Sequence, residues 1–191
     1  RQFEITDNVY SLDGIGVYTT TSVSSIGTDS FFEAEDGLIL ATMYHIKNNL
    51  VITSLEVLLD QNNTVAGAEV FGSIIDTAVF QNDVTTPIYL TEAHTITAAD
   101  VASGIITLNF NGGSGITLTP GAYYAAVELY SNGGTNTIRI ADDETIAQPA
   151  MASAIYLPGD ATYTNGVAFA IRLRQQNCLS ASIVDQTNAC F

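Results

Sequence analysis

The chain has 191 residues, enough for one substantial hydrophobic core, and 47% of them are hydrophobic while only 13% are charged. This composition excludes an intrinsically disordered chain. Only five Lys and Arg stand against twenty Asp and Glu, a formal net charge of −15, which excludes a basic groove for nucleic acid or an anionic membrane surface. No apolar run reaches the length of a transmembrane helix, so no membrane insertion is expected.

Residues 1–30 are rich in Thr, Ser and Gly and alternate only weakly between apolar and polar residues. This pattern predicts an N-terminal edge strand with a linker. The opening run Arg1-Gln-Phe-Glu4 lacks the basic and then apolar pattern of a signal peptide, so we expect a mature or excised segment. The acidic, lysine-poor composition favours an extracellular protein, and divalent cations could offset its self-repulsion.

Residues 31–174 carry the strongest strand patterns, separated by short runs of Gly, Asn, Asp and Pro. The clearest pattern follows the turn Pro120-Gly121, where Tyr123, Ala125, Val127 and Leu129 share one face and Ala122, Tyr124, Ala126, Glu128 and Tyr130 the other. The strands that we predict are Leu38–Tyr44, Leu50–Leu59, Ala68–Ile75, Ile88–Ile96, Ile105–Phe110, Leu118–Tyr130, Thr137–Ala141, Ala150–Leu157 and Gly166–Arg174.

Two further strands have faces that can be assigned. In 50–59, the alternation places Val51, Thr53, Leu55, Val57 and Leu59 on one face and Ile52, Ser54, Glu56 and Leu58 on the other. In 166–174, it predicts that Val167, Phe169, Ile171 and Leu173 face inward while Arg172 and Arg174 face outward.

The sequence therefore predicts an all-β fold, an antiparallel jelly-roll-like β-sandwich of nine to ten strands spanning 31–174. Helix is almost absent from the pattern, and the one helical turn expected is Thr97-Ala-Ala-Asp100, with Thr97 as a possible N-cap.

The C-terminal segment 175–191 is expected to be a linker that contains both cysteines, Cys178 and Cys190. They lie twelve positions apart, and we expect a disulfide between them, which would close a small loop worth roughly 3 kcal/mol in the chain-entropy model. A metal site at the cysteines would need more ligands nearby, and both histidines are distant in sequence.

No catalytic pattern stands out, and we expect a protein that is not an enzyme. A Ser-His-Asp site needs a nucleophile beside a histidine, but the chain has no G-x-S-x-G elbow, and we interpret His45 and His94 as structural or exposed. A glycosidase needs two carboxylates across a cleft and usually aromatic platforms, and there is no tryptophan.

Acidic residues cluster at Asp142, Asp143 and Glu144, which follow a predicted strand at the start of an expected loop, 142–149. Calcium takes six to eight oxygen ligands, mostly from loop carboxylates and carbonyls, so this run is our candidate calcium site. The alternative is a solvated acidic loop. A second run, Glu33, Glu35 and Asp36, fits calcium less well, because Glu33 and Glu35 can share the wet face of a strand.

Tyr124, Tyr130 and Tyr163 are candidate ligand-binding residues, since tyrosine rings can stack on sugars or form a protein interface. Ordinary packing is the alternative. Because Tyr124 lies in a strand as regular as 167–174, we interpret that strand as scaffold and expect recognition first at irregular loops, especially 142–144. Asn62-Asn-Thr64 also fits the eukaryotic N-glycan acceptor pattern.

The span from Leu50 to Arg174 resembles the jelly-roll modules of large proteins that Bacteroidetes export by type IX secretion. The resembling phrases, telling mainly by their order, are Ile52-Thr-Ser-Leu-Glu-Val57, Ala68-Glu-Val-Phe-Gly-Ser-Ile-Ile-Asp76, Tyr89-Leu-Thr-Glu-Ala-His-Thr-Ile-Thr-Ala-Ala-Asp100, Leu118-Thr-Pro-Gly-Ala-Tyr-Tyr124 and Ala168-Phe-Ala-Ile-Arg172. Asp76-Thr-Ala78 resembles the O-glycosylation sequence of such exported proteins and makes Thr77 a candidate glycosylation site.

The tail Ser180-Ala-Ser-Ile-Val-Asp-Gln-Thr-Asn-Ala-Cys-Phe191 resembles the start of a repeat in the gliding-motility adhesin family. The resemblance implies a non-catalytic module of a long secreted or cell-surface protein, serving adhesion, ligand recognition or spacing beside flanking domains. Two alternatives remain: a carbohydrate-binding module for surface glycans, assisted by calcium, or a filament subunit that pairs with other copies by strand addition.

Overall fold

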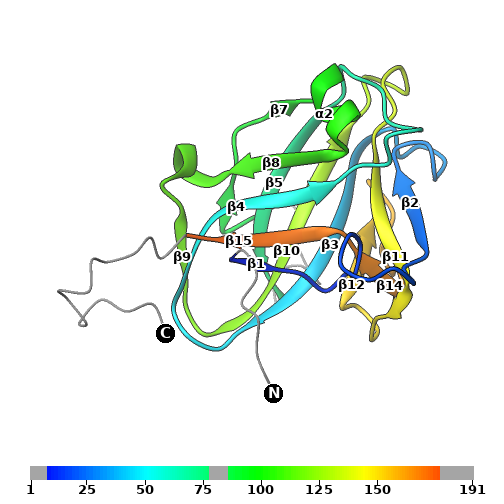
Figure 1. Ribbon diagram of the computed structural model, residues 1–191. Helices are drawn as coiled ribbons and strands as arrows, with labels where there is room; N and C mark the ends of the chain where they lie inside the picture. Colours follow the sequence, from blue (N-terminus) through cyan, green and yellow to red (C-terminus); the bar gives the residue numbers. More distant parts are fainter. Residues whose placement is uncertain (1–7, 78–85, 177–191) are drawn as a thin grey trace.

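The structure is a computed structural model that describes residues 8–77 and 86–176. Its strands form two large antiparallel sheets packed face to face, with a smaller sheet at one end (Figure 1). The prediction of an all-β antiparallel sandwich is confirmed. Nine strands in the described ranges have four or more residues, within the predicted number, and six further segments have two or three.

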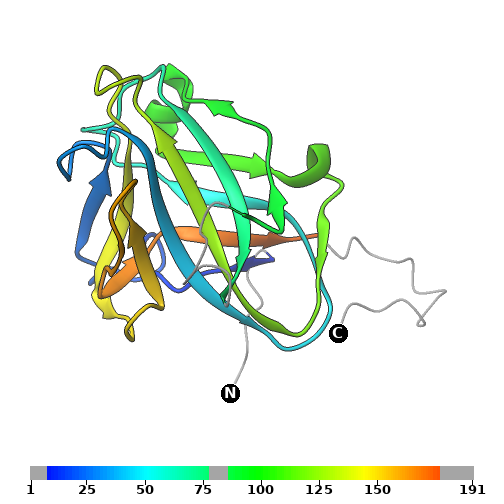
Figure 2. The same ribbon diagram turned by 180° about the vertical axis from the view of Figure 1, so that it is seen from behind.

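Three sheets make up the fold, and each is named here by its number of strands. The five-stranded sheet contains β1 (Val9–Tyr10), β15 (Ile171–Gln175), β4 (Leu50–Leu58), β8 (Ile105–Asn109) and β9 (Ile116–Leu118). The seven-stranded sheet, in front in Figure 2, contains β13 (Thr162–Thr164), β12 (Ser153–Tyr156), β3 (Asp36–Ile46), β10 (Gly121–Tyr130), β5 (Glu69–Asp76), β6 (Tyr89–Leu90) and β7 (His94–Thr95). The three-stranded sheet contains β14 (Val167–Phe169), β11 (Arg139–Ala147) and β2 (Val23–Gly27).

The main core lies between the two large sheets, and β10 supplies one wall of it. Ala125, Val127 and Leu129 are fully buried there and Tyr123 packs against them, as the alternation predicted. The opposite face of β10 places Tyr124 and Ala126 in a second apolar cluster, outside the main core. The strand β10, which has the clearest pattern in the sequence, is therefore covered on both faces.

The predicted strand 166–174 is two strands that belong to different sheets. The chain leaves β14 and enters β15 at Ala170, whose N–H donates to Ala141 and whose carbonyl accepts from Leu58, both backbone bonds. Phe169 and Ile171 still face the main core, as predicted. The break changes the hydrogen-bonding partners without reversing the direction of the side chains.

The face assignment for 50–59 was wrong in its first half. Ile52 lies in the main core together with Leu55, although strict alternation places them on opposite faces. The pairing with β15 is irregular here, since Arg174 opposes Ser54 and Gln175 opposes Ile52, which leaves Thr53 as an extra residue. A bulge of one residue reverses the phase of the alternation.

The helix α2 (Ala98–Ser103) begins where the sequence placed its helical turn. Thr97 caps it: its hydroxyl accepts from the Asp100 N–H, and the Asp100 carboxylate accepts from the Thr97 N–H at 2.8 Å, a complete capping box. A short 3₁₀ turn, η1 (Phe110–Gly113), is the other helical element that we describe. No helix in the described part of the chain is long and apolar enough to cross a membrane.

The N-terminal segment supplies two edge strands. β1 pairs with β15 at the edge of the five-stranded sheet, and β2 pairs with β11 at the edge of the three-stranded sheet. Between them, residues 11–22 cross the outside of β15, and we call this stretch the N-terminal strap (Figure 1). In the structure, residues 8–30 thus belong to the same sandwich as the strands that follow.

Candidate functional site

The acidic run Asp142, Asp143 and Glu144 lies within strand β11, so its placement in a loop was wrong. The pairing of β11 with β2 and β14 explains the error, because it lets a strand continue through carboxylates that alternation alone could not bury. Asp142 and Asp143 are buried, whereas Glu144 is exposed.

The three carboxylates have separate hydrogen-bond partners. Asp142 accepts from Ser24 Oγ and, at 3.2 Å, from Asn165 Nδ2. Glu144 accepts from Ser22 Oγ at 2.8 Å. Neighbours along a strand point to opposite faces, so the run does not converge on one ion. Across residues 8–77 and 86–176, no group of three or more His, Cys, Asp or Glu is arranged to hold a metal.

Asp143 ties the N-terminal strap to the three-stranded sheet. Its Oδ2 accepts from the Gly14 N–H at 2.8 Å, and its Oδ1 accepts from the Thr145 hydroxyl at 2.6 Å and the Thr145 N–H at 2.9 Å. Burial opposes the charge, but these hydrogen bonds outweigh it and hold the pKa of Asp143 below its ordinary value. The carboxylate therefore has a structural role.

The three candidate tyrosines do not share a surface. Tyr124 is buried in the second apolar cluster, and its hydroxyl donates to the Met151 carbonyl at 2.5 Å, so it belongs to the scaffold. Tyr130 is half-buried, and its hydroxyl donates to Glu128, which together with burial raises the pKa of Tyr130 to about 12. Tyr163 is 46% exposed and donates to Asp160 at 2.7 Å. Of the three, only Tyr163 offers much free surface.

Two other predicted sites lie at or beyond the described ranges. Thr77, the candidate glycosylation site, directly follows β5 and is partly buried. Cys178 and Cys190 lie outside the described residues. Of the histidines, His45 is exposed on β3, and His94 Nε2 lies 3.0 Å from the Asp100 carboxylate that caps α2.

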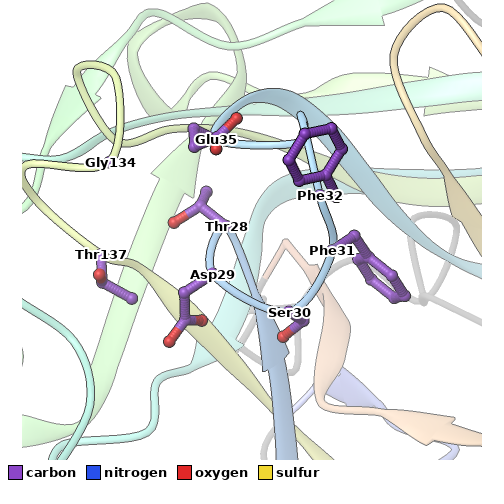
Figure 3. A pocket seen from close by; sticks show the side chains of 8 residues that line it. All are labelled: Thr28, Asp29, Ser30, Phe31, Phe32, Glu35, Gly134 and Thr137. Carbon is purple, nitrogen blue, oxygen red and sulfur yellow. The ribbon is translucent and has the colours of Figure 1, made fainter.

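An open hollow that the sequence did not indicate lies between two loops at one end of the sandwich (Figure 3). Its volume is about 450 Å³, and it is lined by Thr28, Asp29, Ser30, Phe31, Phe32, Glu35, Gly134 and Thr137. Phe32 is 90% exposed, so its ring stands almost entirely in solvent at the rim. The adjacent phenylalanines in a polar segment were the available signal, but their exposure depends on tertiary structure.

Hydrogen bonds hold the two loops of the hollow together. The Ser131 hydroxyl donates to the Glu35 carbonyl at 2.6 Å, and the Asp36 carboxylate accepts from the N–H groups of Ser131 at 2.7 Å and Gly133 at 2.9 Å. On the other side, the buried Thr28 hydroxyl accepts from the Ile138 N–H. The hollow is therefore part of a bonded framework and not merely a gap between free loops.

The titratable residues that line the hollow are both acidic. Asp29 accepts from Arg139 Nη1 at 2.8 Å, and the same guanidinium donates to the hydroxyl and carbonyl of Ser25, so the nearby cation is already bound. In the described part of the chain, no hydrogen bond or ion pair engages the Glu35 carboxylate. The hollow thus combines an exposed aromatic ring, hydroxyl groups and a carboxylate that is available to a ligand.

A buried ionic network lies beneath the N-terminal strap. Arg172 Nε and Nη2 donate to both carboxylate oxygens of Asp13, at 2.9 and 2.5 Å, and Nη1 donates to Glu56 at 3.0 Å. Arg174 also donates to Glu56. Burial disfavours the charged guanidinium, but both carboxylates more than offset this and raise the pKa of Arg172. The network holds the N-terminal strap against β15, and we assign the network a structural role.

No protein-family model and no curated protein matches the chain. Among solved structures, one described as the clostridial cysteine protease Cwp84 after propeptide cleavage is 16% identical, with a TM-score of 0.56 over 86% of this chain and 39% of that one. Another, the cysteine protease and lectin-like domains of Cwp84, a surface layer associated protein of Clostridium difficile, is 13% identical, with a TM-score of 0.52 over 81% and 36%. The chain thus spans less than half of either structure, and at these identities the likeness shows the fold alone.

Proposed function

We propose that this chain is a non-catalytic module of a secreted or cell-surface protein, and that it recognises a carbohydrate in the open hollow beside Phe32. The exposure of Phe32 carries the proposal, because a ring that is 90% exposed contributes almost nothing to the core and stays available to a ligand. Its neighbours in the hollow, Ser30, Glu35 and Thr137, can exchange hydrogen bonds with sugar hydroxyls.

The chemistry of sugars suits such a surface. A pyranose ring presents C–H groups on one face, which pack on an aromatic ring, and hydroxyls around its edge, which need polar partners. The framework bonds from Ser131 and Asp36 hold the loops in place, which lowers the conformational entropy that binding would cost. The likeness to a structure described as containing a lectin-like domain also supports recognition, by analogy of fold.

The test is binding to an array of surface glycans, with Phe32→Ala and Tyr163→Ala as matched variants. Both remove an exposed aromatic ring, but only Phe32 lines the hollow. We expect Phe32→Ala to weaken binding at least tenfold and Tyr163→Ala to leave it unchanged. The array is run with calcium and with a chelator, because calcium-assisted sugar recognition is one of the alternatives that the sequence left open. No binding in either condition would overturn the proposal. If Tyr163→Ala alone lost glycan binding, the hollow would be excluded as the binding site.

Assembly by strand addition is a second candidate, favoured by the edge strand β2. Among residues 8–77 and 86–176, β2 pairs with β11 alone, and Val23 at its start is 54% exposed. An open edge is a template for another chain. Analytical ultracentrifugation tests this candidate: concentration-dependent association that Val23→Lys abolishes would support a filament subunit, and a monomer at all concentrations would exclude it.

A further inference from the structure

The charge of the hollow narrows the class of sugar that it can take. Both titratable residues that line it, Asp29 and Glu35, are acidic. Arg139 is held by Asp29 and Ser25, so Asp29 is neutralised within the protein. Glu35 lacks such a partner in the described part of the chain. A ligand that enters the hollow therefore meets an uncompensated carboxylate.

The aromatic ring at the rim also favours a positively charged ligand. The face of a phenylalanine ring carries negative electrostatic potential and attracts a cation within about 6 Å of its centroid. Phe32 and Glu35 belong to one loop and stand at the same end of the hollow in Figure 3. A group placed between them gains from both if it is positively charged, whereas an anionic group is repelled.

The net charge of the whole molecule also favours a cationic ligand. With a formal net charge of −15, the protein attracts cationic ligands and repels uronic acids or sulfated sugars. This long-range field is not specific to the hollow, so it must be separated from the local effect of Glu35. Glu33 supplies the means, because it is exposed on the same loop but does not line the hollow.

We propose that the hollow recognises an amino sugar with a free ammonium group, which pairs with the Glu35 carboxylate and lies against the Phe32 ring. The inference rests on the proposed function and specifies its ligand: a glycan of unacetylated glucosamine type, in preference to the N-acetylated or hydroxyl form. N-acetylation removes the charge that both groups recognise and adds a bulky amide.

The experiment is isothermal titration calorimetry at about pH 5.5, where amines are protonated and carboxylates are ionised. The probes are a glucosamine oligosaccharide and its N-acetylated counterpart of equal length. We expect the wild-type protein to bind the free amine at least tenfold more tightly. Glu35→Gln should remove most of this preference, because the ammonium group of the free amine loses its charged partner. Glu33→Gln, which removes the same charge from the same loop, should retain the preference.

The outcomes separate this inference from the proposed function. Equal binding of both sugars, abolished by Phe32→Ala, would overturn the preference for the amine and leave the carbohydrate site in place. Equal losses in Glu33→Gln and Glu35→Gln would show attraction by overall charge and would also overturn the inference. If neither sugar nor any arrayed glycan binds, the proposed function fails and this inference fails with it.

Discussion

At the scale of single residues, Arg172 shows how a charged side chain can be placed correctly on a face and still be misjudged. Alternation put it on the outer face of its strand, and it does lie there. Its side chain is nevertheless only 12% exposed, because Asp13 covers it from 159 positions away in the sequence. Nothing in a local pattern indicates a partner at that separation.

We predict that Arg172→Met destabilises the protein by about 3–5 kcal/mol, because it leaves the Asp13 and Glu56 carboxylates buried without their shared cation. Arg174→Met is the matched control, and it should cost only about 1 kcal/mol, since Arg174 is 43% exposed and Glu56 keeps Arg172. Urea unfolding followed by circular dichroism gives both free energies. Similar losses in the two variants would contradict the structural role of the network.

At the scale of elements, the sequence predicted where strands and helices occur better than it predicted which strands pair with one another. Most long strands, the inward face of β10 and the capped helix α2 follow from local alternation and from the side chain of Thr97. The bulge at Thr53 and the switch of sheet at Ala170 do not, because each depends on which strand lies alongside. The same limit concealed the hollow, whose two loops are brought together by the pairing of β2 with β11 and of β3 with β10.

One glycine shows how closely those two strands approach. A Cβ atom added at Gly27 would lie 2.1 Å from the Ile138 carbonyl oxygen and 2.7 Å from the Arg139 Cα, and backbone atoms cannot turn aside as a side chain can. Gly27 is the last residue of β2 and directly precedes the loop that carries Phe32, so the contact positions one side of the hollow.

We therefore predict that Gly27→Ala destabilises the protein by about 3 kcal/mol, the upper range for overpacking, and weakens glycan binding in the fraction that stays folded. Gly159→Ala is the control. Its φ is +74° but its Cβ would have open space, so only backbone strain of about 1 kcal/mol applies. Thermal unfolding of both variants measures the difference. A Gly27→Ala variant as stable as Gly159→Ala would show that the strands separate at little cost.

At the scale of the whole molecule, twenty carboxylates and five strong bases create two opposing dependences on pH. Protonation of exposed carboxylates relieves repulsion and favours the folded state. Protonation of carboxylates that the fold holds by hydrogen bonds disfavours it. Salt separates the two effects, because exposed charges are screened over about 3 Å at 1 M ionic strength while buried pairs are screened much less.

The folded state holds several carboxyl groups in their charged form. Burial raises the pKa of Asp60 and of Asp143, but hydrogen bonds outweigh it, from Asn63 and Ser25 to Asp60 and from Thr145 and Gly14 to Asp143, so both pKa values lie below the ordinary 3.8. A group whose pKa is lower in the folded state adds stability that is complete above its unfolded pKa. That stability is lost as the pH falls through the folded value.

We predict that, in 1 M salt, the free energy of unfolding is constant down to about pH 5 and then falls steadily as the pH drops below 3.8, because the unfolded chain binds more protons than the folded one. Asp143→Asn should make this acid limb shallower as well as lowering stability at pH 7, since the variant has one fewer carboxylate to protonate. Urea unfolding at a series of pH values measures the slope directly. An unchanged slope in Asp143→Asn would mean that the hydrogen bonds from Thr145 and Gly14 do not hold this carboxylate in its charged form. Stability that rises as the pH falls in high salt would mean that repulsion between exposed carboxylates still dominates.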